Sequence, residues 1–345
     1  MLQRFSTRIN LNRNSKSYNA AVIASLVILL LIGIFLSISI GSTRIPLSEI
    51  ISAMRQGNNT SKAYRIVSYV RIPRTLAAVL AGCALSVAGA ILQAVLNNSL
   101  AGPSIIGVNS GAGFFAVLIT AFFPASLYYT TVAAFIGALI AVLLVYFIAR
   151  KTGASRMAIV LAGVAVSSFI GAMTDTVLIL KPNTAVERIA FLIGGLSGVT
   201  IDRLSFASCF IVFSLVISIL LSYDMNLLAL GDESAKSLGL NVTRIRFIFL
   251  ILASMLAGSA ISFAGLLGFV GLIVPHISRF LVGYDNRILL PVSALIGSIF
   301  TLLCDLLARI LFAPFEIPVG IIMSFLGAPF FIHLLIKGRR GQLYD

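Results

Sequence analysis

Residues 247–278 read FIFLILASMLAGSAISFAGLLGFVGLIVPHIS, and this stretch decides the fold class. It holds no Lys, Arg, Asp or Glu in 32 positions. One helix of that length would measure about 48 Å, whereas the hydrocarbon core of a bilayer is about 30 Å thick. Glycines at Gly258, Gly265, Gly268 and Gly271, ahead of Pro275, supply a place for the chain to turn. We therefore predict two membrane-spanning helices here rather than one.

Eight further stretches are long and apolar enough to cross a bilayer. They cover residues 20–40, 74–96, 105–123, 130–149, 157–180, 205–222, 289–310 and 319–336. Together with the two helices of 247–278 they predict an all-α polytopic membrane protein with about ten spans. We expect a single transmembrane domain over 20–336, flanked by tails at 1–19 and 337–345.

The composition excludes a soluble exterior, because 59% of the residues are hydrophobic, 10% are charged and the mean hydropathy is +1.08. Three cysteines lie inside apolar runs, and the chain has two histidines. These numbers indicate neither a disulfide framework nor a metal-binding cluster. We predict no catalytic residue, no bound metal and no cofactor.

Basic residues at the two ends of the chain predict its orientation. The N-terminal tail carries Arg4, Arg8, Arg13 and Lys16, and the C-terminal tail carries Lys337, Arg339 and Arg340. By the positive-inside rule both tails are cytoplasmic, which requires an even number of spans, and ten satisfies it. The expected location is a cell membrane, crossed several times.

One loop departs from that rule. Between the first two spans, on the outer side, lie Arg44, Arg55, Lys62, Arg65, Arg71 and Arg74. Either these residues belong to a surface helix, since Pro46 to Met54 reads as a short amphipathic segment, or they receive an acidic partner from outside. The residues alone leave both explanations open.

Two segments resemble each other within the chain. Residues 80–89 read LAGCALSVAG and residues 256–265 read LAGSAISFAG, with a shorter echo, LAGVAVS, at 161–167. Duplicated halves are common in transporters. Small residues at this spacing also form close helix-packing seams without common descent, and we favour that explanation.

Two acidic residues fall at membrane depth, where an unpaired charge is costly. Asp305 precedes Arg309 by four residues, so a structural ion pair on one helix face is favoured. Asp175 has no nearby base in the sequence. If either acid carried protons, the protein would be an ion-coupled secondary transporter. A membrane-embedded enzyme is the weakest alternative, because no His, Cys or carboxylate cluster lies at one depth.

The segment Leu228 to Leu240, LALGDESAKSLGL, lies between two spans on the predicted cytoplasmic side. It is not a phosphate-binding loop, because Leu230 and Ala235 stand where that motif requires glycine. We predict a connecting segment over about 226–242 that contains a short helix with Gly231 and Gly239 at its ends. Such a helix either links the spans or presents a rigid surface to a cytosolic partner.

Several motifs occur in order and at matching spacing from about residue 20 to the C-terminus. They are RIPR at 71–74, GAILQ at 89–93, residues 98–103, the segment 228–240, GFVGLIVPHISR at 268–279, GYDNRILLP at 283–291 and EIPVG at 316–320. Taken together, they resemble the ferric-siderophore and cobalamin permease family of ABC importers.

The resemblance implies a permease with ten spans that pairs with an identical or paralogous permease. It also implies a cytosolic ATP-binding subunit and an extracytoplasmic substrate-binding protein as partners, with no nucleic acid. Arg71, Arg74 and Arg309 match positions that dock the binding protein, and Asn98 and Leu100 match an inner gate. The ATPase-coupling positions are Leu230, Gly231, Asp232, Glu233, Ala235, Leu238 and Gly239.

The chain departs from the family pattern at three places. Asn97-Asn98-Ser99-Leu100-Ala101 stands where the family usually has Arg-Asn-Pro-Leu-Ala, which makes the inner gate the least secure of these assignments. Asn286 replaces a histidine, and Cys304 replaces an alanine before Asp305. Neither of the last two changes removes an expected contact.

The expected function is therefore ATP-driven import of iron chelates by alternating access, with ATP hydrolysed in a separate subunit. Ferric siderophores are the first choice of substrate, and cobalamin or haem are alternatives within the same family. The rival function is ion-coupled secondary transport through Asp175 or Asp305.

Overall fold

The computed structural model describes residues 16–43, 45–56, 61–123, 127–153 and 155–341. Within these ranges the ordered elements are helices and no strand is present, which confirms the all-α prediction. Seven helices are long and apolar enough to span a membrane, and three shorter apolar helices bring the sum to ten. The predicted tail residues 1–15 lie outside the described part of the chain.

The membrane-crossing helices follow the predicted stretches closely. They are α2 (Lys16–Ser39), α5 (Ile72–Leu96), α6 (Val108–Phe122), α7 (Leu127–Lys151), α8 (Arg156–Leu180), α10 (Ile201–Leu220), α13 (Val242–Ala264), α14 (Val270–Val282), α15 (Asn286–Ile310) and α16 (Val319–Gly341). Helix α16 continues five residues past 336, into the region predicted as a tail.

Short elements connect these helices. They are α3 (Leu47–Gln56), α4 (Lys62–Ile66), the π-helix η1 (Val67–Arg71), the 3-10 helices η2 (Pro103–Ile106) and η3 (Pro182–Thr184), α9 (Ala185–Ile193), α11 (Ser222–Ala229) and α12 (Asp232–Ser237). Helix α3 confirms the amphipathic surface segment expected near Pro46 to Met54. The segment 226–242 contains most of α11 and all of α12, and α12 lies between Gly231 and Gly239, the two glycines expected to bound the connecting helix.

The break predicted inside 247–278 is confirmed. Helix α13 ends at Ala264 and α14 begins at Val270, and both Gly265 and Phe269 have positive φ angles, 67° and 66°. Pro275 lies inside α14 rather than at the turn. The chain reverses where glycine permits a left-handed backbone, and the rest of the apolar block stays helical.

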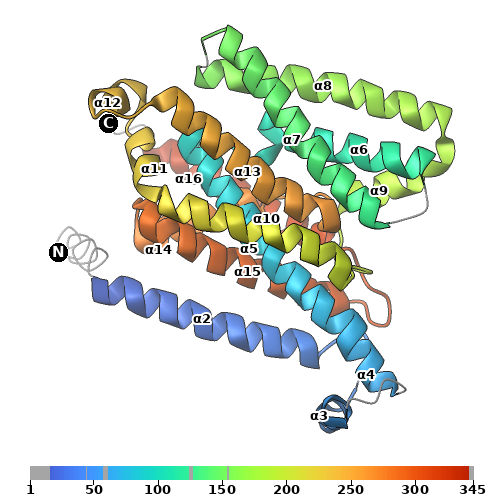
Figure 1. Ribbon diagram of the computed structural model, residues 1–345. Helices are drawn as coiled ribbons and strands as arrows, with labels where there is room; N and C mark the ends of the chain where they lie inside the picture. Colours follow the sequence, from blue (N-terminus) through green and yellow to red (C-terminus); the bar gives the residue numbers. More distant parts are fainter. Residues whose placement is uncertain (1–15, 44, 57–60, 124–126, 154, 342–345) are drawn as a thin grey trace.

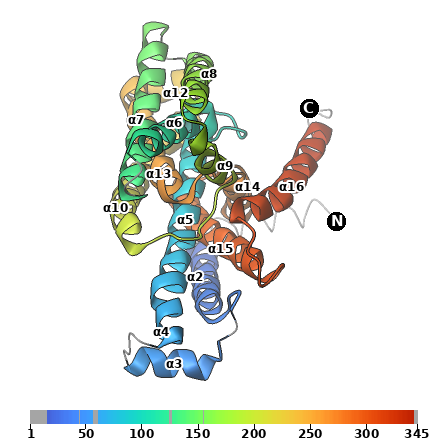
Figure 2. The same cartoon turned by 90° about the vertical axis from the view of Figure 1, so that its right-hand side faces the viewer.

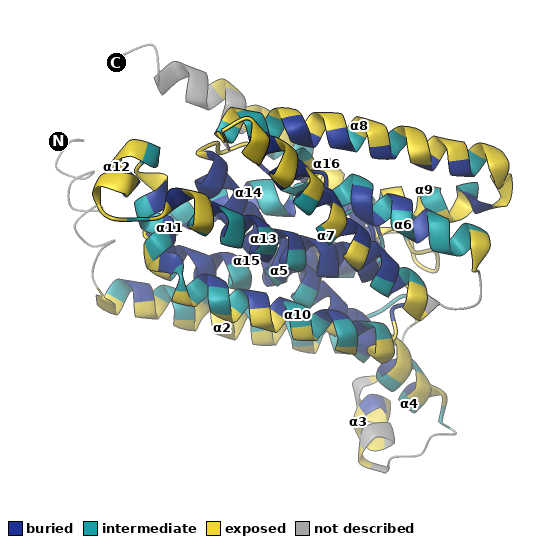
Figure 3. Ribbon diagram, turned by 45° about the horizontal axis from the view of Figure 1, so that its top comes forward, coloured by how far each residue is buried: buried dark blue, intermediate teal, exposed yellow. Residues whose placement is uncertain are grey.

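The centre of the molecule is formed by α5, which packs against α13, α14 and α15. Figure 3 shows these central helices in dark blue and the outward faces of α2, α8 and α10 largely exposed. In the helix that contains α5, 83% of an apolar stretch of 18 residues is buried, against 11% of the corresponding stretch in α2. Helix α2 therefore lies at the periphery, and its Leu and Ile side chains would face lipid.

Small residues bring the central helices close together. A side chain on Gly82 would overlap the backbone of Gly297, and one on Gly89 would overlap that of Gly271. A Cβ added to Gly258, in the second copy of the repeated sequence, would lie 2.8 Å from the Cβ of Ala138. Glycines in both copies thus serve helix packing, in agreement with the packing explanation for the repeat.

The two ends of the molecule differ. Helix α2 begins at the end that holds α11 and α12, whereas α3 and α4 lie at the opposite end (Figure 1; Figure 2). The helix containing α5 is continuous from Lys62 to Leu96, 35 residues, rather than the predicted 74–96. At about 1.5 Å per residue it is about 52 Å long, so its first turns project beyond a bilayer at the α3 end.

Candidate functional site

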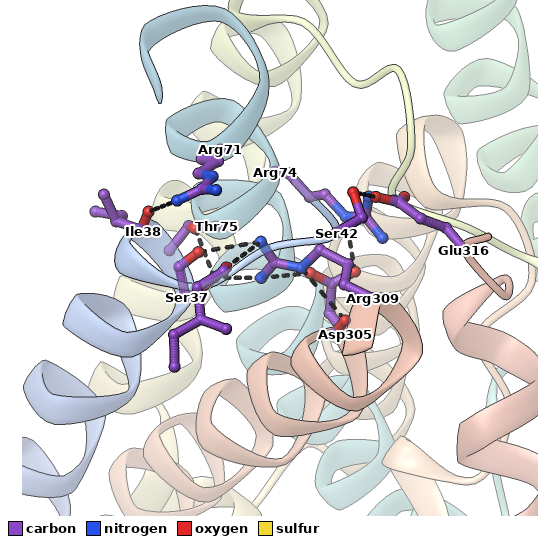
Figure 4. Close-up of polar contacts among 10 residues, drawn as sticks. Ser37, Ile38, Ser42, Arg71, Arg74, Thr75, Asp305, Arg309 and Glu316 are labelled. Carbon is purple, nitrogen blue, oxygen red and sulfur yellow. Dashed lines mark hydrogen bonds and ion pairs between the residues drawn. The ribbon is translucent and has the colours of Figure 1, made fainter. Parts of the chain in front are cut away.

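A buried carboxylate organises the α3 end of the membrane helices. Asp305 of α15 has a fully buried side chain, and its Oδ1 accepts a hydrogen bond of 2.9 Å from Arg74 Nε of α5 (Figure 4). Its Oδ2 lies 3.0 Å from Nη2 of Arg309, one turn along the same helix. The predicted Asp305–Arg309 pair is confirmed. Arg74 is a second partner that the sequence did not reveal.

Glu316 extends this network to the loop before α16. Its carboxylate accepts a hydrogen bond of 2.5 Å from Arg74 and one of 2.7 Å from Ser42 Oγ (Figure 4). Burial opposes ionisation of Glu316, but the hydrogen bonds from Arg74 and Ser42 outweigh it, so its pKa lies below the ordinary value. One ionised glutamate thus joins the α15–α16 loop to α5 and to the segment after α2.

Two other arginines close the C-terminal end of α2. Arg71 donates to the carbonyl oxygen of Ile38 at 2.8 Å (Figure 4). It also donates to the carbonyl oxygens of Ser39 and Thr43, both at 2.7 Å. Arg309 donates to the carbonyl oxygen of Ser37 at 3.0 Å and to its Oγ at 2.6 Å. The last carbonyls of a helix have no partner within the helix, and the helix dipole makes them attractive to cations. These guanidinium groups meet both needs.

The three arginines predicted to dock a binding protein are therefore occupied within the chain. Arg71, Arg74 and Arg309 are 3%, 5% and 2% exposed. Their docking role stays a prediction, and the contacts that the structure shows are internal ones. At the same end, Arg55, Lys62 and Arg65 are basic residues that the structure describes as exposed.

Asp175 has a base that the sequence reading missed. Its Oδ1 lies 2.6 Å from Nη1 of Arg188, thirteen residues further along in α9. Asp175 is an exposed residue near the end of α8, and its pairing holds α9 against that end. The expectation that it has no nearby base is wrong, because the turn through η3 folds α9 back toward α8.

A cavity of about 730 Å³ lies beside the Arg74–Glu316 pair. Its walls come from α6, α9, the α13–α14 break and the start of α16, and Arg203 of α10 also lines it. Backbone hydrogen bonds join the walls: Gly195 N to Ala264 O at 2.8 Å, Leu266 N to Phe191 O at 2.8 Å and Gly320 N to Gly194 O at 3.3 Å. Side chains on Gly194 or Gly320 would overlap the neighbouring backbone, so this crossing requires glycine.

At the opposite end, α12 presents the predicted coupling positions. Gly231 and Gly239 flank it with φ angles of 105° and 86°, conformations that favour glycine. Ala235 is fully buried, whereas Leu230 and Leu238 are 61% and 60% exposed. The helix thus has an anchored face and an exposed apolar face. Glu233 is exposed, and Asp232 contacts Arg156 and Arg246.

The loop after α5 carries the predicted inner-gate residues. Asn97 has a positive φ angle of 45° and ends the helix, and Asn98 Oδ1 accepts a hydrogen bond of 2.9 Å from the backbone N of Leu100. Leu100 is 40% exposed and also lines a cavity of about 100 Å³ beside the α13–α14 break. A gating role for Asn98 and Leu100 stays a prediction.

A helical membrane protein with an internally paired charge network and a small exposed helix at one end has the architecture of a transporter subunit. Among the described residues, no group of three or more His, Cys, Asp or Glu side chains could hold a metal ion. The carboxylate of Asp305 is held by two arginines, which does not favour its use as a proton carrier.

The FecCD transport family matches residues 29–337, and the chain belongs to this family. It is 37% identical to the Fe(3+)-citrate import system permease protein YfmD of Bacillus subtilis, over 95% of this chain and 97% of that protein. It is 36% identical to the iron(3+)-hydroxamate import system permease protein FhuB of the same organism, over 95% of this chain and 86% of that protein.

A solved structure of a metal-chelate type ABC transporter, in an inward-facing conformation, superposes with a TM-score of 0.82 at 29% identity. The match covers 92% of this chain and 99% of that one. The protein is thus a multi-pass membrane permease of the ABC importer class, and the ion-coupled alternative is not favoured.

Proposed function

We propose that the chain is the membrane-spanning subunit of an ATP-driven importer of ferric chelates, with ATP hydrolysed by a separate cytosolic subunit. The observation that carries the proposal is the match to iron-chelate permeases over almost the whole length of both chains. Ferric siderophores and ferric citrate are the first substrates to test, and cobalamin or haem are the alternatives.

In this proposal the α12 end faces the cytoplasm and the α3 end faces outward, so that both termini are cytoplasmic. The basic residues Arg150, Lys151 and Arg156, between α7 and α8, support this orientation under the positive-inside rule. Arg156 contacts Asp232 of α12 at 2.9 Å, which places this basic loop at the α12 end.

Helix α12 would fit a groove of the ATP-binding subunit through Leu230 and Leu238. Its exposed apolar side chains on a glycine-bounded turn are the feature that supports this contact. Closure of the ATP-binding subunits would then displace α12 and shift the permease pair, identical or paralogous, between outward and inward states.

The binding protein would dock at the α3 end. Direct docking through Arg71, Arg74 and Arg309 would require these side chains to leave the contacts that they make within the chain. Exposed Lys62 and Arg65 need no such release, and they add positive charge to the same surface.

Charge reversal separates these two docking surfaces. Lys62→Glu with Arg65→Glu should weaken docking, more so at low salt, and leave the thermal stability unchanged. Arg71→Glu with Arg74→Glu should lower the stability as well, because it replaces two buried guanidinium groups with two carboxylates near Asp305 and Glu316. Undiminished docking of both variants at low salt would remove the docking assignment from this end.

Uptake of radioactive ferric chelates into proteoliposomes tests the transport proposal. The complex of permease, ATP-binding subunit and binding protein should import chelate only when ATP is present on the side of the membrane that holds the ATP-binding subunit. The permease alone should import nothing under an ion gradient. Gly231→Pro should abolish uptake with the complex still assembled, because proline fixes φ near −65° where the structure has 105°.

Gly198→Pro is the matched control, since Gly198 also has a positive φ angle, 73°, and a side chain there meets open space. It lies between α9 and α10, away from α12. Robust uptake by the permease alone under an ion gradient would overturn the proposed function. Unchanged ATP-driven uptake in the Gly231→Pro variant would overturn the proposed role of α12.

A further inference from the structure

The first residue of α12 is tied to two membrane helices. One nitrogen, Nη2 of Arg246 in α13, contacts both oxygens of Asp232 at 2.7 Å. Nη2 of Arg156, the first residue of α8, lies 2.9 Å from Asp232 Oδ1. A single carboxylate therefore links α12 to α8 and α13, and we name these three residues the Asp232 latch.

Burial indicates which member of the latch is fixed in place. The Arg246 side chain is 3% exposed, that of Arg156 24% and that of Asp232 35%. A buried guanidinium is costly unless it is paired, and charge-assisted hydrogen bonds are among the stronger ones available to it. The Arg246 guanidinium is thus held in place inside the protein, and the more exposed Asp232 carboxylate is the member of the pair that can move.

The backbone of α12 does not fix its direction by itself. The helix has six residues, too few to be stable alone, and the positive φ angles of the flanking glycines mark a turn at each of its ends. The buried methyl group of Ala235 is a second attachment of α12 to the protein. Ala235 sets how closely α12 approaches the bundle, and the Asp232 latch sets its orientation.

Helix α11 has a second attachment, to the start of α15. Asn226 donates to Asp285 Oδ1 at 2.8 Å, and its own Oδ1 accepts hydrogen bonds from Asn286 N and Nδ2 at 2.9 and 2.8 Å. Asn286 is 4% exposed. The α11 side of Gly231 is therefore held to α15, which leaves the α12 side to be held by the latch.

We propose that Asp232 is a positioning residue that transmits the displacement of α12 to α8 and α13 during transport. This inference rests on the proposed function, in which an ATP-binding subunit grips α12. A force on exposed Leu230 and Leu238 passes through the carboxylate to both helices. Without the latch, α12 changes its orientation at Gly231 and Gly239, and its displacement is not transmitted to α8 and α13.

The test measures chelate imported per ATP hydrolysed by the reconstituted complex with its ATP-binding subunit and binding protein. In assembled Asp232→Asn complexes, import per ATP hydrolysed should fall about tenfold, equivalent to about 1.4 kcal/mol. Asp232→Glu, which keeps the charge, should restore part of the ratio. Asp224→Asn is the matched control, because Asp224 of α11 lies on the same connector and takes part in no ion pair among the described residues.

Arg156→Gln is measured alongside, since it removes the contacts of α8 with Asp232 and with the Leu228 carbonyl and leaves Arg246 paired with Asp232. It should lower import per ATP by about threefold, roughly 0.65 kcal/mol, and it decides the matter if Asp232→Asn does not assemble. An unchanged ratio in an assembled Asp232→Asn complex, or in Arg156→Gln, overturns the latch. Absence of ATP-driven import by the wild-type complex instead overturns the proposed function.

Discussion

Removing the charge of Asp305 is the sharpest test of the network at the α3 end. Asp305→Asn keeps the shape of the side chain but leaves the guanidinium groups of Arg74 and Arg309 without their shared carboxylate. Asp305 is completely buried, and its two nearest guanidinium nitrogens lie at 2.9 and 3.0 Å. Glu316, which is 29% exposed, remains as the only other carboxylate of the network drawn in Figure 4.

The expected cost follows from that geometry. Removing one partner of a buried ion pair typically costs about 3–5 kcal/mol, because the other charge is left uncompensated. Two arginines are affected here, so we expect the upper half of the range. At roughly 2 °C per kcal/mol for a large chain, the Tm should fall by roughly 8–10 °C.

Thermal denaturation of the purified protein in detergent can be followed through its own cysteines. The chain has no tryptophan, but it has three free cysteines, and the buried Cys304 adjoins Asp305. A thiol-reactive dye labels the exposed Cys209 at the start, and the later rise in labelling reports when the buried Cys304 becomes accessible. Asp202→Asn is the control, because this exposed residue in the first turn of α10 should cost less than about 1 kcal/mol.

A double variant separates charge from shape. If Asp305→Asn is destabilising because it leaves a buried guanidinium without its carboxylate, the variant with both Asp305→Asn and Arg309→Met should lose less stability than the sum of the losses of the two single variants. A Tm of Asp305→Asn equal to that of the wild type, or strictly additive losses in the double variant, would refute the reasoning.

Three other predictions concern single residues. Gly320→Ala should prevent normal folding, because its methyl group would overlap the carbonyl of Ile193, whereas Gly195→Ala, which meets open space, should express and melt like the wild type in the thiol assay. Arg71→Gln should expose the end of α2 and speed amide hydrogen exchange at residues 40–43, while Arg65→Gln, on an exposed side chain, should leave exchange there unchanged. The Asp232 carboxylate has a pKa below its ordinary 3.8, because the hydrogen bond and charge of Arg246, with the charges of Arg156 and Lys236, outweigh its burial. The Asp232 carboxylate therefore contributes its full stabilisation above its ordinary pKa, and this stabilisation is lost as the pH falls through the lower pKa of the folded protein. The difference in Tm between wild type and Asp232→Asn should be constant from about pH 5 to 8 and shrink in stronger acid.

Much of the architecture could be predicted because hydropathy is a local property. The charge-free block at 247–278 is too long for one span, and two of the glycines named for its turn, Gly265 and Gly268, lie in the observed break. The Asp305–Arg309 pair could be predicted as well, since a four-residue spacing fixes the two side chains on one face of a helix. The projection of the α5 helix back to Lys62 could not, because it lies outside the apolar pattern.

The sequence by itself determined that this protein is a bundle of membrane helices, where most of these helices begin and end, and which short segment stands out between them. Only the tertiary structure decided what the charged residues do. Arg74 meets Asp305 across 231 positions of sequence, and Arg71 turns to carbonyls of α2 rather than outward. The physical reason is that partition into lipid is settled by each segment's own side chains, whereas a buried charge takes whichever opposite charge or free carbonyl the packing of distant helices brings within reach.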